Sequence, residues 1–476
     1  MRNETLRKSN GRATRRWTAI LCAGMMIALS GVGAVATNGS STLSQDRSIG
    51  SASSSQQRPN VLIVLTDDQR VDTLGVMPRT RRWFGRRGTR FSNAFTTTPL
   101  CCPSRSSILT GRYMHNHGVL NNVRTDKLDF RSTFPRYLHG AGYRNAFFGK
   151  FLNSWPIRRR PPYFHTWAIF HGPSCYYDCD WHVNRRVRGV RRYSTDFIAR
   201  RATRFLHRAN ESDARPWFLT LSVSAPHSPY LPAERHRRRA VPGWPGNPAT
   251  RERDRSDKPP YVRHKRDRFR TALMTRRSQL RSLMAVDDLV GKVARTLGEL
   301  RESRNTLAIF LSDNGVLWGE HRLRSKTQPY TPGVRIPLMV RWPGRVPAGR
   351  VDRRLVANID VAPTILDASG TEADSAYPVD GRSLLDSWTR ERLLIEYRRY
   401  GHFKAPTWRS IRTKTSQYVE YYRNGLIVFR EYYALRRDPW QNRNLLRDGT
   451  HANDPNVRKL HRRLRADAVC AGSACP

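Results

Sequence analysis

The sequence is short of lysine, of acidic residues and of long apolar runs. Only ten of the 85 basic side chains are lysines, and the 38 acidic residues leave a formal net charge of +47. After residue 36 no apolar stretch is long enough to cross a bilayer. The seven cysteines lack tight Cys-x-x-Cys spacing, which disfavours a four-cysteine zinc site. At 476 residues and 38% hydrophobic, the chain is too apolar for wholesale disorder and long enough for two domains.

The one long apolar run lies near the N-terminus and predicts export. Arginine-rich residues up to Arg16 precede apolar residues 17–36, and Ala34-Val35-Ala36 fits a small-residue cleavage site. Residues 1–36 are therefore predicted to be a signal peptide, and a membrane anchor is the alternative. The mature protein is expected to be secreted or periplasmic, with no stable membrane anchor after cleavage.

Export would affect both the cysteines and the charge. In an oxidising compartment, two local disulfides are plausible, Cys175–Cys179 and Cys470–Cys475. Cleavage would remove six basic residues and one acidic residue, which leaves +42. Residues 235–270 form a proline-rich insertion with 13 basic and 4 acidic side chains. The positive electrostatic field of so many basic side chains attracts polyanions. Nucleic acid, anionic membrane and sulfated polysaccharide are all candidates on charge alone.

Beyond a flexible linker at residues 37–58, the pattern predicts an α/β fold in two parts. Continuous apolar runs at residues 61–65, 217–223 and 306–312 are typical of strands that are buried on both faces. Residues 278–300 space their apolar side chains at helical intervals, so strands and helices alternate. These features predict a catalytic domain over residues 59–390. Shorter aromatic-rich runs around Asn424-Gly425 then predict a small antiparallel sheet within residues 391–476.

Two of the predicted strands end in acidic and amide side chains. The first continues as Thr66-Asp67-Asp68-Gln69, and the third as Ser312-Asp313-Asn314-Gly315. Ligands gather beyond the carboxyl ends of strands in α/β sheets, and adjacent carboxylates repel each other unless a cation neutralises them. A hard divalent ion with oxygen ligands is therefore predicted, and a solvated, helix-capping turn is the alternative. The similar pair Asp287-Asp288 lies within the predicted helix and is expected to be structural.

A third motif begins at Cys101. The segment reads Leu100-Cys101-Cys102-Pro103-Ser104-Arg105, followed by Leu109-Thr110-Gly111. Of the two adjacent cysteines, only Cys101 has Pro, Ser and Arg at the second, third and fourth following positions. This Cys-x-Pro-Ser-Arg pattern resembles the one by which sulfatases mark a cysteine for oxidation to formylglycine. A buried cysteine pair before a helix is the alternative.

Further short sequence motifs extend the resemblance from about residue 59 to residue 450, and they occur in the expected order along the chain. They are Pro59-Asn60-Val61, Gly111-Arg112-Tyr113-Met114-His115-Asn116-His117-Gly118, Phe148-Gly149-Lys150-Phe151-Leu152-Asn153, Ala225-Pro226-His227, Gly319-Glu320-His321-Arg322-Leu323, Lys326, Arg335-Ile336-Pro337-Leu338, Tyr433-Ala434-Leu435, Asp438-Pro439 and Asn444-Leu445. The chain resembles the type I, formylglycine-dependent sulfatases, and their N-acetylglucosamine-6-sulfatase branch most closely. The resemblance implies an alkaline-phosphatase-like sandwich with a large central mixed sheet and a small C-terminal antiparallel sheet subdomain.

The resemblance also implies roles for individual residues. Asp67, Asp68, Asp313 and Asn314 would hold a divalent cation, usually Ca²⁺ with Mg²⁺ also fitting, together with an oxygen of residue 101. A formylglycine-generating enzyme would convert Cys101 to formylglycine (3-oxoalanine). One hydroxyl of the hydrated aldehyde would attack sulfur, and the other would later expel the sulfate.

Four further side chains would serve the same reaction. Arg105 would point back at the oxygens of residue 101, and Lys150 and Lys326 would neutralise sulfate oxygens. His227 would protonate the leaving alcohol or bind sulfate. Taken singly, a lysine after glycine or a histidine beside proline is more often a surface or loop residue.

One position departs from the family pattern. Many sulfatases have histidine two residues after the lysine that corresponds to Lys150, where this chain has Leu152. His117, or His115, is a candidate for the missing contact with residue 101. The alternative is that both histidines are structural loop residues.

The sequence as a whole predicts a sulfuric-ester hydrolase that acts on a carbohydrate sulfate, such as a glycosaminoglycan. Two alternatives are a phosphonate or phosphate monoester hydrolase with the same nucleophile, and a catalytically silent polyanion-binding homologue. Nucleic acid is not an expected partner, because export and a metal–sulfate site give it no role.

Overall fold

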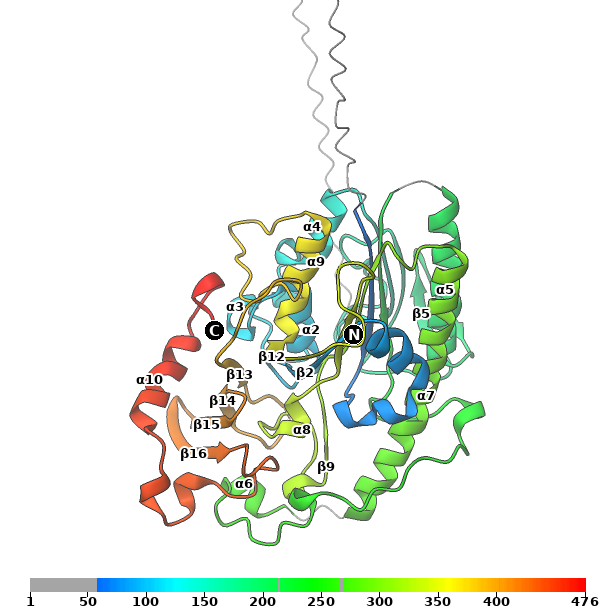
Figure 1. Cartoon of the computed structure of the whole chain (residues 1–476). Coiled ribbons are helices and arrows are strands. Elements are labelled where there is room, and N and C mark those ends of the chain that lie inside the picture. Colours follow the sequence, from blue (N-terminus) through cyan, green and yellow to red (C-terminus); the bar gives the residue numbers. More distant parts are fainter. Residues whose placement is uncertain (1–57, 213–214, 266–268, 402) are drawn as a thin grey trace, which may run out of the picture. The chain divides into compact units, whose positions relative to one another are not determined.

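The computed structural model describes residues 58–212, 215–265, 269–401 and 403–476 (Figure 1). The predicted signal peptide, and all of the predicted linker except Arg58, lie outside the described residues. No helix among the described residues is long and apolar enough to cross a membrane.

A ten-stranded mixed sheet forms the centre of the fold. Its order is β12-β2-β11-β8-β1-β7-β3-β4-β5-β6. The strands are β1 (Asn60–Thr66), β2 (Thr89–Phe95), β3 (Arg144–Lys150), β4 (Thr166–Phe170), β5 (Cys179–Val183), β6 (Arg186–Val190), β7 (Trp217–Ser222), β8 (Thr306–Ser312), β11 (Leu338–Arg341) and β12 (Val351–Ala357). The five adjacent strands β8-β1-β7-β3-β4 run parallel to one another. The three apolar runs in the sequence are β1, β7 and β8, as predicted.

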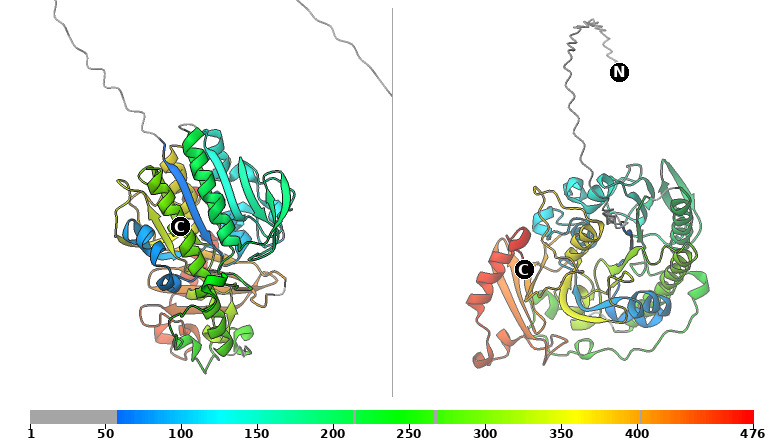
Figure 2. Two further views of the ribbon diagram at one scale, coloured as in Figure 1. Left: turned by 90° about the vertical axis from the view of Figure 1, so that its right-hand side faces the viewer. Right: turned by 45° about the horizontal axis from the view of Figure 1, so that its top comes forward.

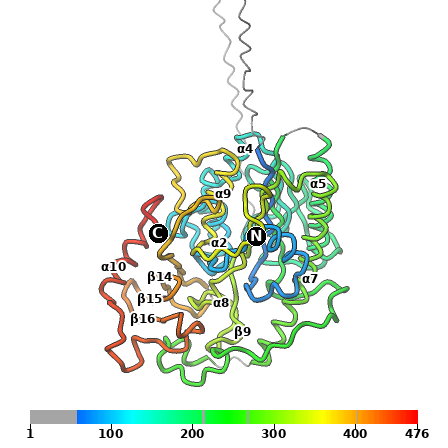
Figure 3. The backbone as a smooth tube through the Cα atoms, in the orientation of Figure 1, coloured from blue at the N-terminus to red at the C-terminus, as the bar shows by residue number. Residues whose placement is uncertain are grey.

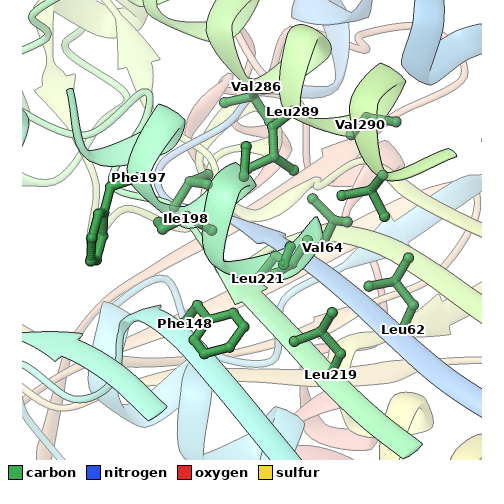
Figure 4. Close-up of a cluster of buried hydrophobic side chains, with 14 of the residues drawn as sticks. Leu62, Val64, Phe148, Phe197, Ile198, Leu219, Leu221, Val286, Leu289 and Val290 are labelled. Atoms are coloured by element: carbon green, nitrogen blue, oxygen red, sulfur yellow. The ribbon is translucent and has the colours of Figure 1, made fainter. Parts of the chain in front are cut away.

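Helices cover both faces of this sheet, which explains why its central strands are mainly apolar (Figure 2). The longer helices are α2 (Cys101–Thr110), α4 (Phe134–Gly140), α5 (Ser194–Ser212), α7 (Phe269–Glu299), α9 (Val361–Ser369) and α10 (Val457–Asp467). Leu62 and Val64 of β1 pack under α5 and α7 (Figure 4), whereas Val61 and Ile63 belong to the core under α2, α4 and α9. Successive strand residues point to opposite faces, so a strand that is buried on both sides has no face that favours polar residues.

The predicted helix at residues 278–300 is the C-terminal part of α7, which begins nine residues earlier at Phe269. In the described residues of the basic insertion before position 266, the helical segments are two single 3-10 turns at Glu234–His236 and Pro248–Thr250 and the short α6 (Pro260–Arg263), in agreement with the predicted loop (Figure 3). The other short elements are α1 (Pro78–Thr80), α3 (Met114–His117), α8 (Thr331–Val334), β9 (Leu317–Trp318) and β10 (Arg324–Ser325).

A second sheet forms the C-terminal part of the chain. It is an antiparallel meander of β13 (Leu393–Tyr397), β14 (Thr407–Arg412), β15 (Ser416–Arg423) and β16 (Leu426–Ala434). The β15–β16 turn has positive φ at both Asn424 and Gly425, as the Asn-Gly pair predicts for a two-residue hairpin. The large mixed sheet and this small antiparallel sheet confirm the predicted fold class. The two disulfides Cys175–Cys179 and Cys470–Cys475 are also present.

The parallel strands bring four polar positions to one edge of the large sheet. β1, β3, β7 and β8 are neighbours, and they end at Thr66, Lys150, Ser222 and Ser312. The acidic segments that follow β1 and β8 are therefore adjacent in space, and Asp313 N–H donates to the carbonyl of Thr66. This edge is where ligands bind in parallel α/β sheets.

Candidate active site

Helix α2 begins directly at this edge with Cys101. Leu100 before it is extended, and every residue of α2 is buried. The helix is fixed to the strand ends by polar contacts, because Ser104 Oγ donates to the Asp313 carbonyl at 2.5 Å and Arg105 donates to the Lys150 carbonyl at 2.9 Å. The N-terminus of a buried helix carries partial positive charge and unsatisfied N–H groups. Residue 101 therefore lies where an anion would be stabilised.

Three buried carboxylates converge beside Cys101. Oxygens of Asp67, Asp68 and Asp313 lie within 4.8 Å of one another. Asp68 has a φ of +63°, which aspartate tolerates better than most residues. Its N–H donates to Asp313 Oδ1 at 3.1 Å, so the turn after β1 is locked to the turn after β8. The predicted meeting of the two acidic strand ends is seen in the structure.

Arg105 binds two of these carboxylates and the strand ends below them. Its Nε donates to Asp313 Oδ2 at 2.9 Å and its Nη2 to Asp67 Oδ2 at 3.2 Å, while its Nη1 donates to Ser222 Oγ at 2.7 Å. These bonds occupy Nε, Nη1 and Nη2. The structure brings Arg105 into the site, as expected, but its hydrogen bonds orient the carboxylates rather than Cys101.

Two lysines complete the charge balance. Lys150 Nζ binds Asp67 Oδ2, and Lys326 Nζ donates to Asp68 Oδ1 at 2.6 Å and to Cys101 Sγ at 2.8 Å. Burial is the largest single influence and opposes the charged form of Asp67, but the neighbouring cations, of which Lys150 contributes most, together outweigh it and hold the pKa of Asp67 well below its usual range. Burial and the nearby Asp67 raise the pKa of Asp313. Three anions thus face three cations in this buried site.

Cys101 itself is a poor nucleophile in its unmodified form. Its thiol is fully buried and donates to Asp67 Oδ1 at 3.7 Å. Burial and the charge of Asp67 raise the pKa of Cys101 to about 12. The thiolate is the reactive form of cysteine, so at neutral pH this thiol stays protonated.

His227 comes from the loop after β7 and faces the same cluster. Its Nδ1 donates to the Ser228 carbonyl at 2.8 Å, and its Nε2 lies 3.8 Å from Asp68 Oδ2. Burial lowers the pKa of His227, although Asp67 and Asp68 oppose this effect. With Nδ1 as the donor, the neutral ring directs the lone pair of Nε2 toward the carboxylates. This nitrogen could exchange a proton with a group in the site.

The donor set at the strand ends fits a hard divalent cation. Asn314 Nδ2 donates to Asp68 Oδ1 and to the Gly315 carbonyl, whereas its Oδ1 is buried and accepts no hydrogen bond from the described residues. A buried acceptor without a partner is costly unless something binds it. Three carboxylates and one unpaired amide oxygen are the ligands that Ca²⁺ and Mg²⁺ prefer.

His117 contacts the back of α2 rather than the cluster. One ring nitrogen, Nδ1, accepts the N–H of Val119, and Nε2 lies 3.1 Å from Ser107 Oγ. Burial lowers the pKa of His117 to about 3, so the ring is neutral. Leu152, where the resemblance noted in the sequence would place a histidine, is buried in an apolar core cluster with Phe151 and Trp155. Because both ring nitrogens of His117 have partners of this kind, the structure favours a structural role for His117 over a contact with residue 101.

His115 connects α3 to the C-terminal part of the chain by hydrogen bonds. Its Nδ1 lies 2.8 Å from Glu396 Oε1 and its Nε2 3.0 Å from the Cys470 carbonyl, so both nitrogens donate when the ring is charged. Burial lowers the pKa of His115, but the hydrogen bond and charge of Glu396 raise it overall. The stability that this ring contributes is therefore complete below its unfolded pKa of about 6.5 and is lost as pH rises through the higher folded value.

We expect His115→Gln to lower the free energy of unfolding by about 1–3 kcal/mol at pH 5.5, the worth of a hydrogen bond to a charged group, and by less at pH 9. Urea unfolding at both pH values measures this difference. The exposed His451 provides the control, because His451→Gln should change neither value. An equal loss for His115→Gln at both pH values would contradict the charged pair.

Other residues that serve the site were missed from the sequence. Ser222 accepts from Arg105 and donates to the Lys150 carbonyl at 2.7 Å. Trp408 of β14 donates to the Thr327 carbonyl at 2.9 Å, so the C-terminal sheet supports the loop that carries Lys326. Ser222 is a polar residue at the end of an apolar strand, and this position could have indicated its role from the sequence. Nothing local marks Trp408, which is more than 80 residues from its partner.

Comparisons with known proteins agree on one family. The family model described as "Sulfatase" matches residues 59–371, and "N-sulphoglucosamine sulphohydrolase, C-terminal" matches residues 319–469. N-acetylglucosamine-6-sulfatase of Homo sapiens is 30% identical over 492 residues, which cover 88% of this chain and 86% of that protein. A Drosophila melanogaster extracellular sulfatase SULF-1 homolog is 36% identical over 360 residues, 70% of this chain. The chain spans only about a third of that relative's length.

Solved structures share the fold at lower identity. BT4656 in complex with its substrate D-glucosamine-2-N,6-O-disulfate has a TM-score of 0.76 and 23% identity, over 86% of this chain and 97% of that one. The phosphonate monoester hydrolase of Agrobacterium radiobacter has a TM-score of 0.66 and 20% identity, over 87% and 96%. Matches at this identity establish the fold alone.

Proposed function

The chain belongs to the sulfatase family, and we propose that it is a sulfuric-ester hydrolase that removes sulfate from a carbohydrate sulfate. The observation that carries this proposal is the position of Cys101. It begins a buried helix, lies 2.8 Å from Lys326, and adjoins three converging carboxylates. Relatives named N-acetylglucosamine-6-sulfatase, and a neighbour bound to a glucosamine disulfate, favour a sulfated amino sugar as substrate.

The nucleophile is proposed to be formylglycine at position 101. Because the unmodified thiol has a pKa of about 12, it would react poorly at neutral pH. Its conversion requires a formylglycine-generating enzyme before the site is closed, since Cys101 is fully buried. The hydrated aldehyde supplies two hydroxyls on one carbon, one to take the sulfuryl group and one to release it.

Asp67, Asp68, Asp313 and the Oδ1 of Asn314 are proposed to hold a divalent cation, Ca²⁺ or Mg²⁺. When bound, this cation supplies charge that lowers the pKa of a hydroxyl at residue 101 and offsets negative charge on sulfate. Asp67, Asp68 and Asp313 are already balanced by Arg105, Lys150 and Lys326. A divalent ion would therefore leave the site with a net positive charge, which suits an anionic sulfate ester.

Four side chains of the protein are proposed to bind the sulfate, orient the carboxylates and transfer a proton. Lys150 and Lys326 bind sulfate oxygens, and their ammonium groups already lie at the cluster. Arg105 fixes the orientation of Asp67 and Asp313. Once its Nε2 has been protonated, His227 gives that proton to the leaving alcohol, while its Nδ1–H bond to Ser228 fixes the ring. The enclosed position of the cluster excludes bulk water and strengthens each of these interactions.

The proposed location is extracellular or periplasmic. The apolar N-terminal run and the two disulfides support export, and relatives from fly and nematode are named as extracellular sulfatases. The substrate would be a sulfated polysaccharide such as a glycosaminoglycan, in keeping with the formal charge of +42 that remains after cleavage of residues 1–36.

The structural likeness to a phosphonate monoester hydrolase makes the choice of ester the decisive test. We expect the purified, modified protein to hydrolyse an aryl sulfate with a kcat/KM at least 100-fold above that for the matched aryl phosphate and phenylphosphonate. A preference for either phosphorus ester would overturn the proposal. A panel of glucosamine sulfated at the amino group or at the 3- or 6-oxygen then identifies the sulfate that is removed.

A further inference from the structure

A second basic site lies at the opposite edge of the large sheet. A cavity of about 440 Å³ opens between α5, the start of β3 and the start of β4. We call it the rear basic cavity and define it by six residues, His139, Arg144, His165, Arg201, Arg204 and Arg208. Arg144 begins β3 and Lys150 ends it. At about 3.3 Å per residue, Arg144 lies about 20 Å along this strand from Lys150, and the cavity extends beside the strand as far as Phe148.

Three of these arginines come from one face of α5. Arg201, Arg204 and Arg208 are spaced three and four residues apart, so their side chains are neighbours on the helix. Like charges at this spacing destabilise a helix. None of the three forms an ion pair with a carboxylate in the described part of the chain, although the protein contains many such pairs elsewhere.

Arg201 is the least favourable of these charges. Its side chain is half-buried with the guanidinium over the Phe148 ring at 5.6 Å, and its Nε is buried without a hydrogen-bond partner among the described residues. Burial, together with Arg188, Arg204 and Arg208, lowers the pKa of Arg201 to about 10. A bound anion would supply the missing acceptor and the missing countercharge.

Two stacked histidines form another wall of the cavity. The rings of His139 and His165 lie 4.8 Å apart and nearly parallel, at 7°. His165 Nδ1 accepts the N–H of Asn145 at 3.1 Å, so its Nε2 carries the proton and can donate. The cavity therefore combines guanidinium groups, which match the oxygens of sulfate and phosphate, with an imidazole N–H donor.

We propose that the rear basic cavity is a second anion-binding site, which takes a sulfate group of a polyanionic glycan and holds that chain on the enzyme. The identity of the glycan as the substrate polymer rests on the proposed function, whereas anion binding at this cavity does not. Polymeric substrates would then be retained between turnovers, and small sulfate esters would gain nothing.

The test compares two triple variants of the full mature protein with equal loss of charge. One is R201Q/R204Q/R208Q on α5, and the control is R458Q/R462Q/R465Q, three exposed arginines on α10. Binding of a heparin octasaccharide is measured by calorimetry at fixed salt. We expect the α5 variant to bind at least tenfold more weakly than the control. Equal weakening by both variants, or no weakening by either, would overturn the proposal.

Turnover separates this cavity from the active site. In the α5 variant, KM for the polymeric substrate should rise while kcat/KM for an aryl sulfate stays unchanged; unchanged polymer kinetics would contradict the retention role. If the protein has no sulfatase activity, the heparin binding still decides the existence of the site. Polyphosphate serves as the second probe. Loss of polyphosphate binding without loss of heparin binding would contradict a glycan ligand.

Folding of the variant is checked by thermal unfolding. Because the substitutions remove repulsion, we expect the Tm of the α5 variant to be no lower than that of the parent. Should the triple variant fail to fold, the exposed pair R204Q/R208Q is compared with R462Q/R465Q under the same criteria.

Discussion

Cys101→Ala should abolish turnover, whereas Cys102→Ala should retain most of it. The two cysteines are adjacent and both fully buried, but only Cys101 Sγ contacts Lys326 and Asp67. Cys102 Sγ instead accepts the N–H of Asn153 at 3.1 Å, away from the cluster. Loss of a nucleophile costs on the order of 10⁴-fold or more in kcat. The two variants are thus a matched comparison, because the same Cys→Ala substitution is made at two adjacent positions.

Mass spectrometry of the tryptic peptide and aryl sulfate kinetics together measure this result. In protein from the native host, conversion of Cys101 replaces the thiol and one hydrogen by an oxygen, and the peptide becomes lighter. Cys102→Ala should show the same fall in mass, and Cys101→Ala should show none. Loss of activity in Cys102→Ala with a correctly converted Cys101 would contradict the assignment, as would activity in Cys101→Ala.

Cys101→Ser probes the chemistry more finely. A serine hydroxyl can accept the sulfuryl group, but it has no second hydroxyl on the same carbon to release it. We expect one equivalent of aryl alcohol per enzyme, followed by no further turnover. Sustained turnover by this variant would show that formylglycine is not required.

Asp68→Asn should lower activity by a factor on the order of 10³, whereas Asp288→Asn should leave it unchanged. Each residue is the second of an Asp-Asp pair and each pairs with a cation, Asp68 with Lys326 and Asp288 with Arg235. Only Asp68 lies in the carboxylate cluster. Asp288 is part of α7, and its side chain is about a quarter exposed. The comparison separates the loss of a cation ligand from the loss of any ion pair.

Cation removal gives the corresponding result without a mutation. Dialysis against a chelator should abolish turnover, and addition of Ca²⁺ or Mg²⁺ should restore it. If the cation was present at 100 times its Kd, removal should also lower the free energy of unfolding by about 3 kcal/mol. Metal analysis and thermal unfolding check both points, and Asp68→Asn should need a higher cation concentration for recovery. Full activity in protein shown to be free of metal would contradict the proposed site.

The sequence by itself determined the central strands and the candidate site positions at their ends. A strand that is buried on both faces is apolar at nearly every position, so β1, β7 and β8 are visible as runs. Asp67, Asp68, Asp313 and Asn314 are visible as the polar residues directly after two of those runs. The parallel arrangement then requires the strand ends to share one edge. The choice of Cys101 over Cys102 is likewise local, since it depends on fixed offsets to Pro103, Ser104 and Arg105.

Only the tertiary structure decided which partner each of these groups meets. Lys326 contacts Cys101, which is 225 residues away in sequence. Arg105 donates hydrogen bonds to the carboxylates rather than to residue 101. Both ring nitrogens of His117 have partners on the side of α2 that faces away from the cluster. The rear basic cavity likewise exists only because α5 packs beside the start of β3 and β4. These contacts depend on sheet order and on the paths of loops, and neither leaves a local pattern in the chain. Local patterns fix where a residue sits on its own strand or helix, whereas long-range packing fixes what its side chain touches.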